Sequence, residues 1–164
     1  DANDLVGVIN NANFNDPKQT VISGTQAGVA KACELLKAAG AKRALPLAVS
    51  APFHCALMQP AAEALKAALA GIALQAPAIP VVNNIDVAAP ADAAAIRDAL
   101  YRQASGPVRW VEVVQALKAR GATHIIECGP GKVLAGMVKR IDGDLASGAI
   151  FDPSSLADTQ GLLA

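Results

Sequence analysis

Hydrophobic positions recur at helical spacing between residues 25 and 40. The apolar side chains there follow the i, i+3, i+4, i+7 rule, at Val29, Ala32, Cys33 and Leu36. Thr25 stands where a helix N-cap is expected, and Gly40 stands where such a helix should stop. The pattern therefore predicts one amphipathic helix between these two residues.

Four later segments carry the same helical pattern. They run from about 58 to 70, from Asp92 as N-cap to about Gln103, from Trp110 to a stop at Gly121, and from 132 to about 141. Five short runs are instead typical of strands. These are Leu5–Ile9, Gln19–Ser23, Ala44–Val49, Pro77–Val82 and Thr123–Cys128, with a polar break expected at 10–17 between the first two.

The order of these elements predicts an α/β protein with two parts. In residues 1–49 the order strand, strand, helix, strand indicates a ferredoxin-like unit without its opening strand and helix. In residues 50–164 helices alternate with buried strands, which favours a parallel sheet covered on its faces. We expect a truncated start in the first part, and the pattern assigns no element after about residue 141.

Composition narrows the possible functions. Hydrophobic residues make up 53% of the chain but aromatic residues only 3%, so the core should consist of small aliphatic side chains. Fourteen basic residues balance 14 acidic ones, and we therefore expect neither a nucleic acid nor a membrane as partner. The three cysteines form no C-x-x-C pair, and no signal sequence or bilayer-length apolar run is present. These features predict a cytoplasmic protein with no metal site.

His54 is the best candidate for chemistry. It lies in Ser50–Met58, between an expected strand and an expected helix, where α/β folds place reactive groups. A histidine can take a proton from a hydroxyl and return it to a leaving group near neutral pH. From position alone, a structural histidine is the more common alternative, and the second histidine, His124, is expected to be structural.

No nucleophile accompanies His54 in this sequence. The G-x-S-x-G elbow that presents an activated serine is absent. Cys55 is adjacent to His54, but a buried thiol is the favoured interpretation because consecutive side chains point in different directions. Gly129-Pro130-Gly131-Lys132 could hold a phosphate, although a tight turn between a strand and a helix is favoured.

Several strings of the sequence carry a resemblance to a known family. They are Asn13-Phe14-Asn15, the run Lys37–Leu47, Phe53–Met58, Pro80–Asn84 and Gly129–Leu134. In this order they resemble the bacterial malonyl-CoA:acyl carrier protein transacylases of type II fatty acid synthesis, from about Leu5 to Ile141. The resemblance implies that residues 50–164 form the C-terminal part of an α/β-hydrolase-like large subdomain.

The resemblance also implies a ping-pong transfer of malonyl from coenzyme A to the phosphopantetheine thiol of acyl carrier protein. It implies that His54 is the catalytic base and that the main-chain oxygen of Gln103 orients it. Phe53 would shape an unbranched acyl pocket, and Asn15 would contact the pantetheine-bearing ligand. Lys42 and Arg43 would belong to the basic surface that meets the acidic carrier protein.

The chemistry of the family is only partly represented. The serine elbow, the oxyanion-hole glutamine and the malonyl-binding arginine are expected in an N-terminal half, which would be a partner of this chain. No cofactor is expected, since coenzyme A enters only with the substrate. Two alternatives stay open: an acyltransferase domain of a polyketide synthase, and a non-catalytic module that binds acyl carrier protein or coenzyme A.

Overall fold

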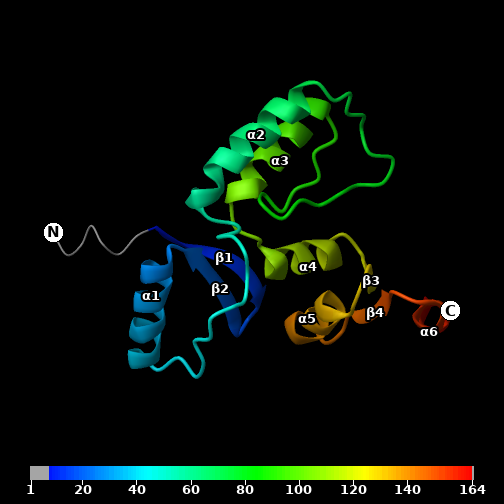
Figure 1. The fold of residues 1–164 in the computed structure, drawn as a ribbon. Coiled ribbons are helices and arrows are strands. Elements are labelled where there is room, and N and C mark those ends of the chain that lie inside the picture. Colours follow the sequence, from blue (N-terminus) through cyan, green and yellow to red (C-terminus); the bar gives the residue numbers. More distant parts are fainter. Residues whose placement is uncertain (1–7, 164) are drawn as a thin grey trace. The chain divides into compact units, whose positions relative to one another are not determined.

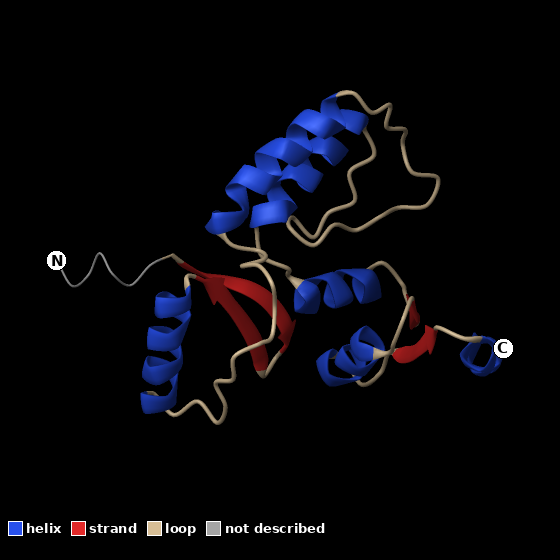
Figure 2. Ribbon diagram, in the orientation of Figure 1, coloured by secondary structure: helices blue, strands red, loops and turns tan. Residues whose placement is uncertain are grey.

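The computed structural model describes residues 8–163 and divides them into two compact units. The first comprises the residues up to Asn13 together with Thr20–Val108, and the second comprises Phe14–Gln19 and the chain from Arg109 onward. Figure 1 labels the elements and Figure 2 separates helices from strands. The division into a small subdomain at residues 1–49 and a large subdomain at residues 50–164 stays a prediction.

The chain begins with a two-stranded hairpin. Strand β1 spans Ile9–Asp16 and strand β2 spans Gln19–Gly24, with a turn at Pro17 and Lys18. The prediction of a polar break at 10–17 was therefore wrong, because this asparagine-rich run is itself a strand. The earlier strand expected at Leu5–Ile9 falls largely on residues 5–7, which lie outside the described residues.

Helix α1 confirms the first helical prediction. It spans Gln26–Ala38, and the Thr25 hydroxyl accepts a hydrogen bond from the Gly28 N–H at 3.2 Å. Gly40 follows the helix with a φ of +94°, a conformation that glycine adopts without steric cost. Local signals were sufficient here because both ends of the helix are specified by capping residues.

Two predicted strands do not form. Residues 44–49 and 77–82 carry no strand, and their apolar side chains are exposed, with Leu45 at 70% and Ile79 at 79%. A strand requires a hydrogen-bonded neighbour, and within residues 8–163 these two segments have none. Alternating or continuous apolar residues alone therefore overpredicted the sheet.

Two helices of the first unit pack side by side (Figure 1). A short 3₁₀ turn, η1 at Ala56–Met58, leads into α2 at Gln59–Ala70, and α3 follows at Ala93–Ser105. The buried contacts use small side chains, notably Ala62 and Ala99 at 0% and 4% exposure. Such residues let the helix backbones approach closely, so the small aliphatic core expected from composition is present here.

The second unit contains a strand–helix–strand arrangement. Helix α4 spans Trp110–Ala119, β3 spans His124–Cys128, α5 spans Val133–Ile141, β4 spans Ala146–Ile150 and α6 spans Pro153–Leu163. Strands β3 and β4 are parallel, with His124 opposite Ala146 and Cys128 opposite Ile150. The expectation of a parallel sheet is therefore confirmed, whereas β4 and α6 were not predicted.

The core of this unit lies between the helices and the parallel strands. Val114, Val138 and Leu145 are buried together, and Trp110, Ile125 and Ile141 pack against them. Near them, the tip of the hairpin is joined to α5 by an ion pair between Arg140 Nε and the buried Asp16 Oδ2, at 2.7 Å. Asp16 also accepts the Lys18 N–H at 2.8 Å, so both of its oxygens have partners.

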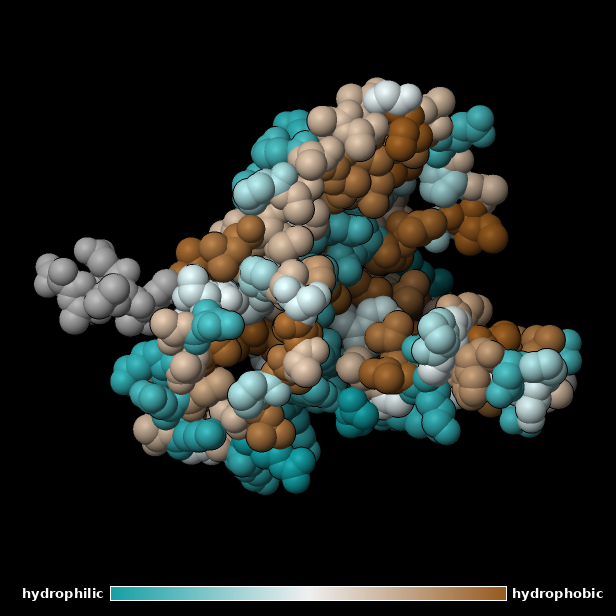
Figure 3. Space-filling view, in the orientation of Figure 1, coloured by the Kyte–Doolittle hydropathy of each residue, from teal (hydrophilic) through white to brown (hydrophobic). Residues whose placement is uncertain are grey.

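The surface of the described chain is mixed in character. Figure 3 shows hydrophobic surface around α2 and the loop after it, where Leu65, Ile72, Ile79 and Val81 are exposed. Despite this apolar area, none of the helices in residues 8–163 has both the length and the hydrophobicity of a membrane-spanning segment.

Candidate active site

The candidate catalytic histidine lies in a tight turn just before η1. His54 has a φ of 57°, in the left-handed region that non-glycine residues seldom adopt. Such a conformation costs on the order of 1 kcal/mol and persists only where surrounding contacts impose it, as at many functional sites. The contacts made by this turn should therefore show what fixes the imidazole.

The imidazole of His54 contacts a main-chain carbonyl. Its Nδ1 lies 3.1 Å from the oxygen of Gly106, which directly follows α3. A carbonyl can only accept, so this contact is a hydrogen bond when Nδ1 carries the proton. In the neutral ring the other nitrogen, Nε2, then has the free lone pair that a general base needs. With its proton on Nδ1, the imidazole can therefore accept a second proton at Nε2.

Strand β1 holds both sides of this contact. Asn10 Oδ1 accepts the N–H of Ala56 at 3.0 Å and so ties the start of η1 to the strand. Two residues further along, the Ala12 carbonyl accepts the N–H of Val108 at 2.8 Å, which ties down the segment after Gly106. The histidine turn and its carbonyl partner are therefore fixed to neighbouring positions of one strand.

Close packing around position 106 leaves room only for glycine. A Cβ added there would collide with Ile85 Cδ1 and would lie 2.9 Å from the Arg102 carbonyl. The backbone of Gly106 has an ordinary φ of −97°, so its lack of a side chain matters for space and not for conformation. Glycine allows the loop that carries Ile85 to pack directly against the carbonyl-bearing peptide.

The Ile85 loop is held by an ion pair. Arg102 on α3 donates to both carboxylate oxygens of Asp86, at 2.6 and 2.7 Å, and to Asp98 at 2.7 Å. These bonds, those to Asp86 first, raise the pKa of Arg102 and keep its charge fixed. The loop also contains a second strained position, Val87, with a φ of 57°. Val87 lies two residues after Ile85, which packs against Gly106.

The acceptor differs from the one expected from the resemblance. Gln103 lies inside α3, whereas the carbonyl that His54 contacts belongs to Gly106, three residues later. The residue four positions after Gln103 is Pro107, which has no N–H to donate back to the Gln103 carbonyl. An orienting role for Gln103 stays a prediction, and Gly106 is the residue that sequence reasoning missed.

The neighbours of His54 differ in burial. Phe53 immediately precedes it and is 48% exposed, so its ring is available to shape a ligand pocket. Cys55 is fully buried and its thiol donates to the Pro52 carbonyl at 3.1 Å. This burial confirms the interpretation of Cys55 as a buried thiol.

The remaining predicted residues lie elsewhere in the chain. Lys42 and Arg43 are exposed in the loop after α1, as a docking surface requires. Asn15 is partly buried near the end of β1 and belongs to the second unit. The structure does not test the contacts proposed for these residues, which stay predictions.

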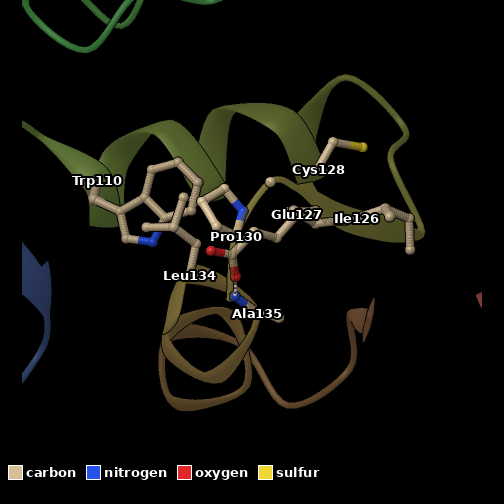
Figure 4. A pocket seen from close by; sticks show the side chains of 9 residues that line it. Trp110, Ile126, Glu127, Cys128, Pro130, Leu134 and Ala135 are labelled. Atoms are coloured by element: carbon tan, nitrogen blue, oxygen red, sulfur yellow. Dashed lines mark hydrogen bonds between the residues drawn. The ribbon is translucent and has the colours of Figure 1, made fainter. Parts of the chain in front are cut away.

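A separate pocket of about 290 Å³ lies in the second unit. Its lining includes Trp110, Cys128 and Leu134, and Figure 4 shows Cys128 directed away from Trp110. Glu127 Oε2 accepts the N–H of Ala135 at 2.9 Å at the start of α5. A carboxylate therefore already occupies this helix start, which argues against a phosphate site and agrees with a tight turn at 129–131.

Comparison with known proteins identifies the class of protein to which this site belongs. The acyl transferase domain family matches residues 4–144, which is most of the chain. The chain therefore belongs to the acyl transferase domain family. In that class, a histidine with a free Nε2 is suited to activate a hydroxyl nucleophile.

The relatives narrow the class further. The malonyl CoA-acyl carrier protein transacylase of Salmonella typhimurium is 53% identical over 92% of this chain, and that of Escherichia coli is 51% identical over 92%. A solved acyl-carrier-protein S-malonyltransferase from Burkholderia pseudomallei is 60% identical, with a TM-score of 0.92 over 95% of this chain. A malonyl-transacylase solved in complex with a type II polyketide acyl-carrier protein is 47% identical, with a TM-score of 0.93 over 96%.

The match covers only part of each relative. The chain spans 48% of the length of the two curated relatives and 51% of the two solved chains. The likeness of sequence and fold confirms the resemblance found in the sequence.

Proposed function

We propose that this chain supplies the general base for malonyl transfer from malonyl-CoA to acyl carrier protein. The observation that carries the proposal is the contact between His54 Nδ1 and the Gly106 carbonyl, which leaves Nε2 to accept a proton. The nucleophile would be a serine outside these 164 residues, since no G-x-S-x-G elbow occurs among them. The reaction would take place in the cytoplasm, where fatty acids are built by the type II system.

The first half of the reaction would load the serine. Nε2 of His54 takes the hydroxyl proton as the serine oxygen attacks the thioester carbonyl of malonyl-CoA. When the tetrahedral intermediate collapses, the carbon–sulfur bond breaks and the imidazolium gives its proton to the departing thiolate of coenzyme A. The Gly106 carbonyl accepts a hydrogen bond from Nδ1–H throughout and so holds the ring in one orientation.

The second half would run the same proton transfers with a different thiol. The phosphopantetheine thiol of acyl carrier protein gives its proton to Nε2 and attacks the malonyl-serine ester. The serine oxygen then recovers a proton from the imidazolium as it leaves. Base and acid functions thus alternate on one nitrogen, and no redox cofactor or metal takes part.

Selectivity and docking would come from residues around the site. The exposed ring of Phe53, next to His54, would leave no room for a methyl branch at C2 of the acyl group, at a cost of about 1 to 3 kcal/mol for overpacking. Lys42 and Arg43 would attract the acidic carrier protein, and Asn15 would contact the pantetheine arm. Gln103 would contribute a second carbonyl near the imidazole.

Reconstitution tests the proposed function. The chain is mixed with a polypeptide that corresponds to the N-terminal half of the Escherichia coli relative, and release of coenzyme A from malonyl-CoA is followed with holo acyl carrier protein as acceptor. We expect transfer only when both polypeptides are present. A stable complex of the two that binds acyl carrier protein but transfers no malonyl would support a non-catalytic binding module instead.

A further inference from the structure

A chain of polar side chains joins the beginning of α2 to the end of α3. The Ser105 hydroxyl donates to Gln59 Oε1 at 3.1 Å. Ser105 is the last residue of α3 and directly precedes Gly106, whereas Gln59 opens α2, the helix that follows the histidine turn. This hydrogen bond therefore spans the two segments that provide His54 and its carbonyl partner.

The amide of Gln59 is held in one orientation. Its Nε2 donates to Glu63 Oε1 at 2.8 Å and lies 2.7 Å from the Tyr101 hydroxyl. A carboxylate can only accept, so the NH₂ end must face Glu63 and the carbonyl end must face Ser105. The acceptor presented to Ser105 is thus fixed by partners on both helices.

Tyr101 and Glu63 complete the cluster. The Tyr101 hydroxyl donates to Glu63 Oε1 at 2.6 Å, and Lys66 lies over the tyrosine ring with its Nζ 4.7 Å from the centroid. The bonds from Tyr101 and then Gln59 lower the pKa of Glu63, so its carboxylate stays charged as an acceptor. Glu63 and Tyr101 therefore orient Gln59, the acceptor of Ser105, and Lys66 lies over the Tyr101 ring.

We propose that Gln59 and Ser105 form a clasp that positions the Gly106 carbonyl against Nδ1 of His54. Both are positioning residues, since they act on the imidazole through the Gly106 peptide and touch no reacting atom. The inference deepens the proposed function and rests on it, because it assigns the clasp to the same base. The clasp adds a side-chain tether to the main-chain tether that Val108 makes with β1.

The loss of the clasp would affect the tautomer of the imidazole. With the Gly106 carbonyl in place, the neutral ring keeps its proton on Nδ1; if that carbonyl moves away, the preference weakens and the proton spends more time on Nε2. A ring protonated on Nε2 has no lone pair to offer a hydroxyl. The tautomer ratio of His54 is therefore a direct readout of the clasp, and general stability alone would not change it.

Nuclear magnetic resonance of the whole chain can measure this ratio. The sequence contains two histidines, so a His124→Gln background leaves the signals of His54 alone. Long-range proton–nitrogen correlations at alkaline pH, where an imidazole is neutral, report how the proton is divided between Nδ1 and Nε2. Far-UV circular dichroism checks that each variant retains its helices.

Four variants separate the clasp from other effects. We expect Ser105→Ala and Gln59→Ala each to lower the Nδ1–H to Nε2–H ratio by at least about twofold, the lower end of what one hydrogen bond is worth. Ser105→Thr retains the hydroxyl and should keep the wild-type ratio. Ser154→Ala makes the same chemical change on α6, in the second unit, and should also leave the ratio unchanged.

The outcomes are decisive in both directions. An unchanged ratio in Ser105→Ala would overturn the inference, and so would a failure of Ser105→Thr to keep the wild-type ratio. The measurement needs no turnover, so it is independent of the proposed function. If the ratio responds as expected while the reconstituted enzyme transfers no malonyl, the clasp stands and the proposed function fails.

Discussion

In the second unit, Val114 and Val138 are fully buried beside Leu145, and apolar packing holds helix to strand. In the first unit, the histidine turn is held by hydrogen bonds that Asn10 Oδ1 and the Gly106 carbonyl accept, and it includes a strained backbone conformation. Apolar packing is non-directional, whereas a hydrogen bond to one carbonyl fixes the orientation of a ring. The orientation of the imidazole in the first unit therefore depends on a few directional contacts, whereas the core of the second unit depends on apolar packing.

The largest expected effect comes from the histidine itself. In the reconstituted enzyme, His54→Ala should lower the rate of malonyl transfer by roughly 10² to 10⁴, the usual contribution of a positioned general base. The second unit should be unaffected, as judged by hydrogen exchange of the α4 and α5 amides. A transfer rate within a few-fold of wild type would remove His54 from the mechanism.

The core of the second unit should show the opposite behaviour. Val138→Ala removes two buried methyl groups from a side chain with 0% exposure and should lower the free energy of unfolding by about 2 to 3 kcal/mol. The matched control is Val133→Ala on the same helix, where the side chain is 66% exposed and we expect a change within about 0.5 kcal/mol. Equal losses in the two variants, measured by denaturant unfolding, would contradict the assigned core.

Gly106→Ala should damage the first unit and the chemistry together. The new methyl group collides with Ile85, so we expect a loss of about 1 to 3 kcal/mol from overpacking and slower transfer as the carbonyl shifts from His54. Gly71→Ala is the control, because its nearest neighbour, the Ala68 carbonyl, would be 4.0 Å from the added carbon. Thermal unfolding and the reconstitution assay would measure both effects, and wild-type behaviour of Gly106→Ala would refute the close packing.

The ion pair of the second unit predicts a dependence on pH. The hydrogen bond from Arg140 is the main cause that lowers the pKa of Asp16 below its ordinary value of 3.8. A carboxylate whose pKa is lower in the folded state stabilises the fold above its unfolded-state pKa. It loses this contribution as the pH falls through its folded-state pKa. Asp16→Asn should therefore cost about 1.5 kcal/mol near neutral pH, at the lower end for charged hydrogen bonds, and progressively less below the ordinary aspartate range.

An exposed ion pair provides the control for that experiment. Lys31 and Glu34 on α1 have side chains that are 52% and 69% exposed, so Glu34→Gln should change stability by less than about 0.5 kcal/mol. Urea unfolding at several pH values compares the two variants. A cost for Asp16→Asn that stays constant down to acid pH would show that the charge of Asp16 is not what matters.

The smallest effect concerns backbone strain at the site. His54→Gly and His54→Ala both remove the imidazole, but only glycine adopts a φ of 57° without penalty. We expect the glycine variant to be more stable than the alanine variant by about 1 kcal/mol, the typical cost of a left-handed residue. An alanine variant that is as stable as the glycine variant would show that the turn relaxes once the imidazole is gone.

Local signals explain what the sequence could predict. Helices α1 and α3 were found because Thr25 and Asp92 cap them, and in the structure both side chains accept main-chain N–H groups. The strand expected at 44–49 failed because strands depend on partners that no local pattern reveals. Strand β4 was missed for the converse reason, since Ala146–Ile150 has no apolar alternation and is a strand only beside β3.

The site was predicted in part for similar reasons. His54 stood out through its residue type and its place in a turn, and Cys55 through its neighbourhood. Its partner is 52 residues away in the sequence, and a main-chain carbonyl leaves no mark in the residue types. The available signal was Pro107, which ends α3 and leaves carbonyls of its last turn without helical donors.

The central claim is that this chain provides the base and not the nucleophile. Intact-protein mass spectrometry after incubation of the reconstituted enzyme with malonyl-CoA tests it most directly. The account predicts that the companion polypeptide gains one malonyl group and that the mass of this chain does not change. A malonyl group found on the 164-residue chain would contradict the account, because the nucleophile would then lie within it.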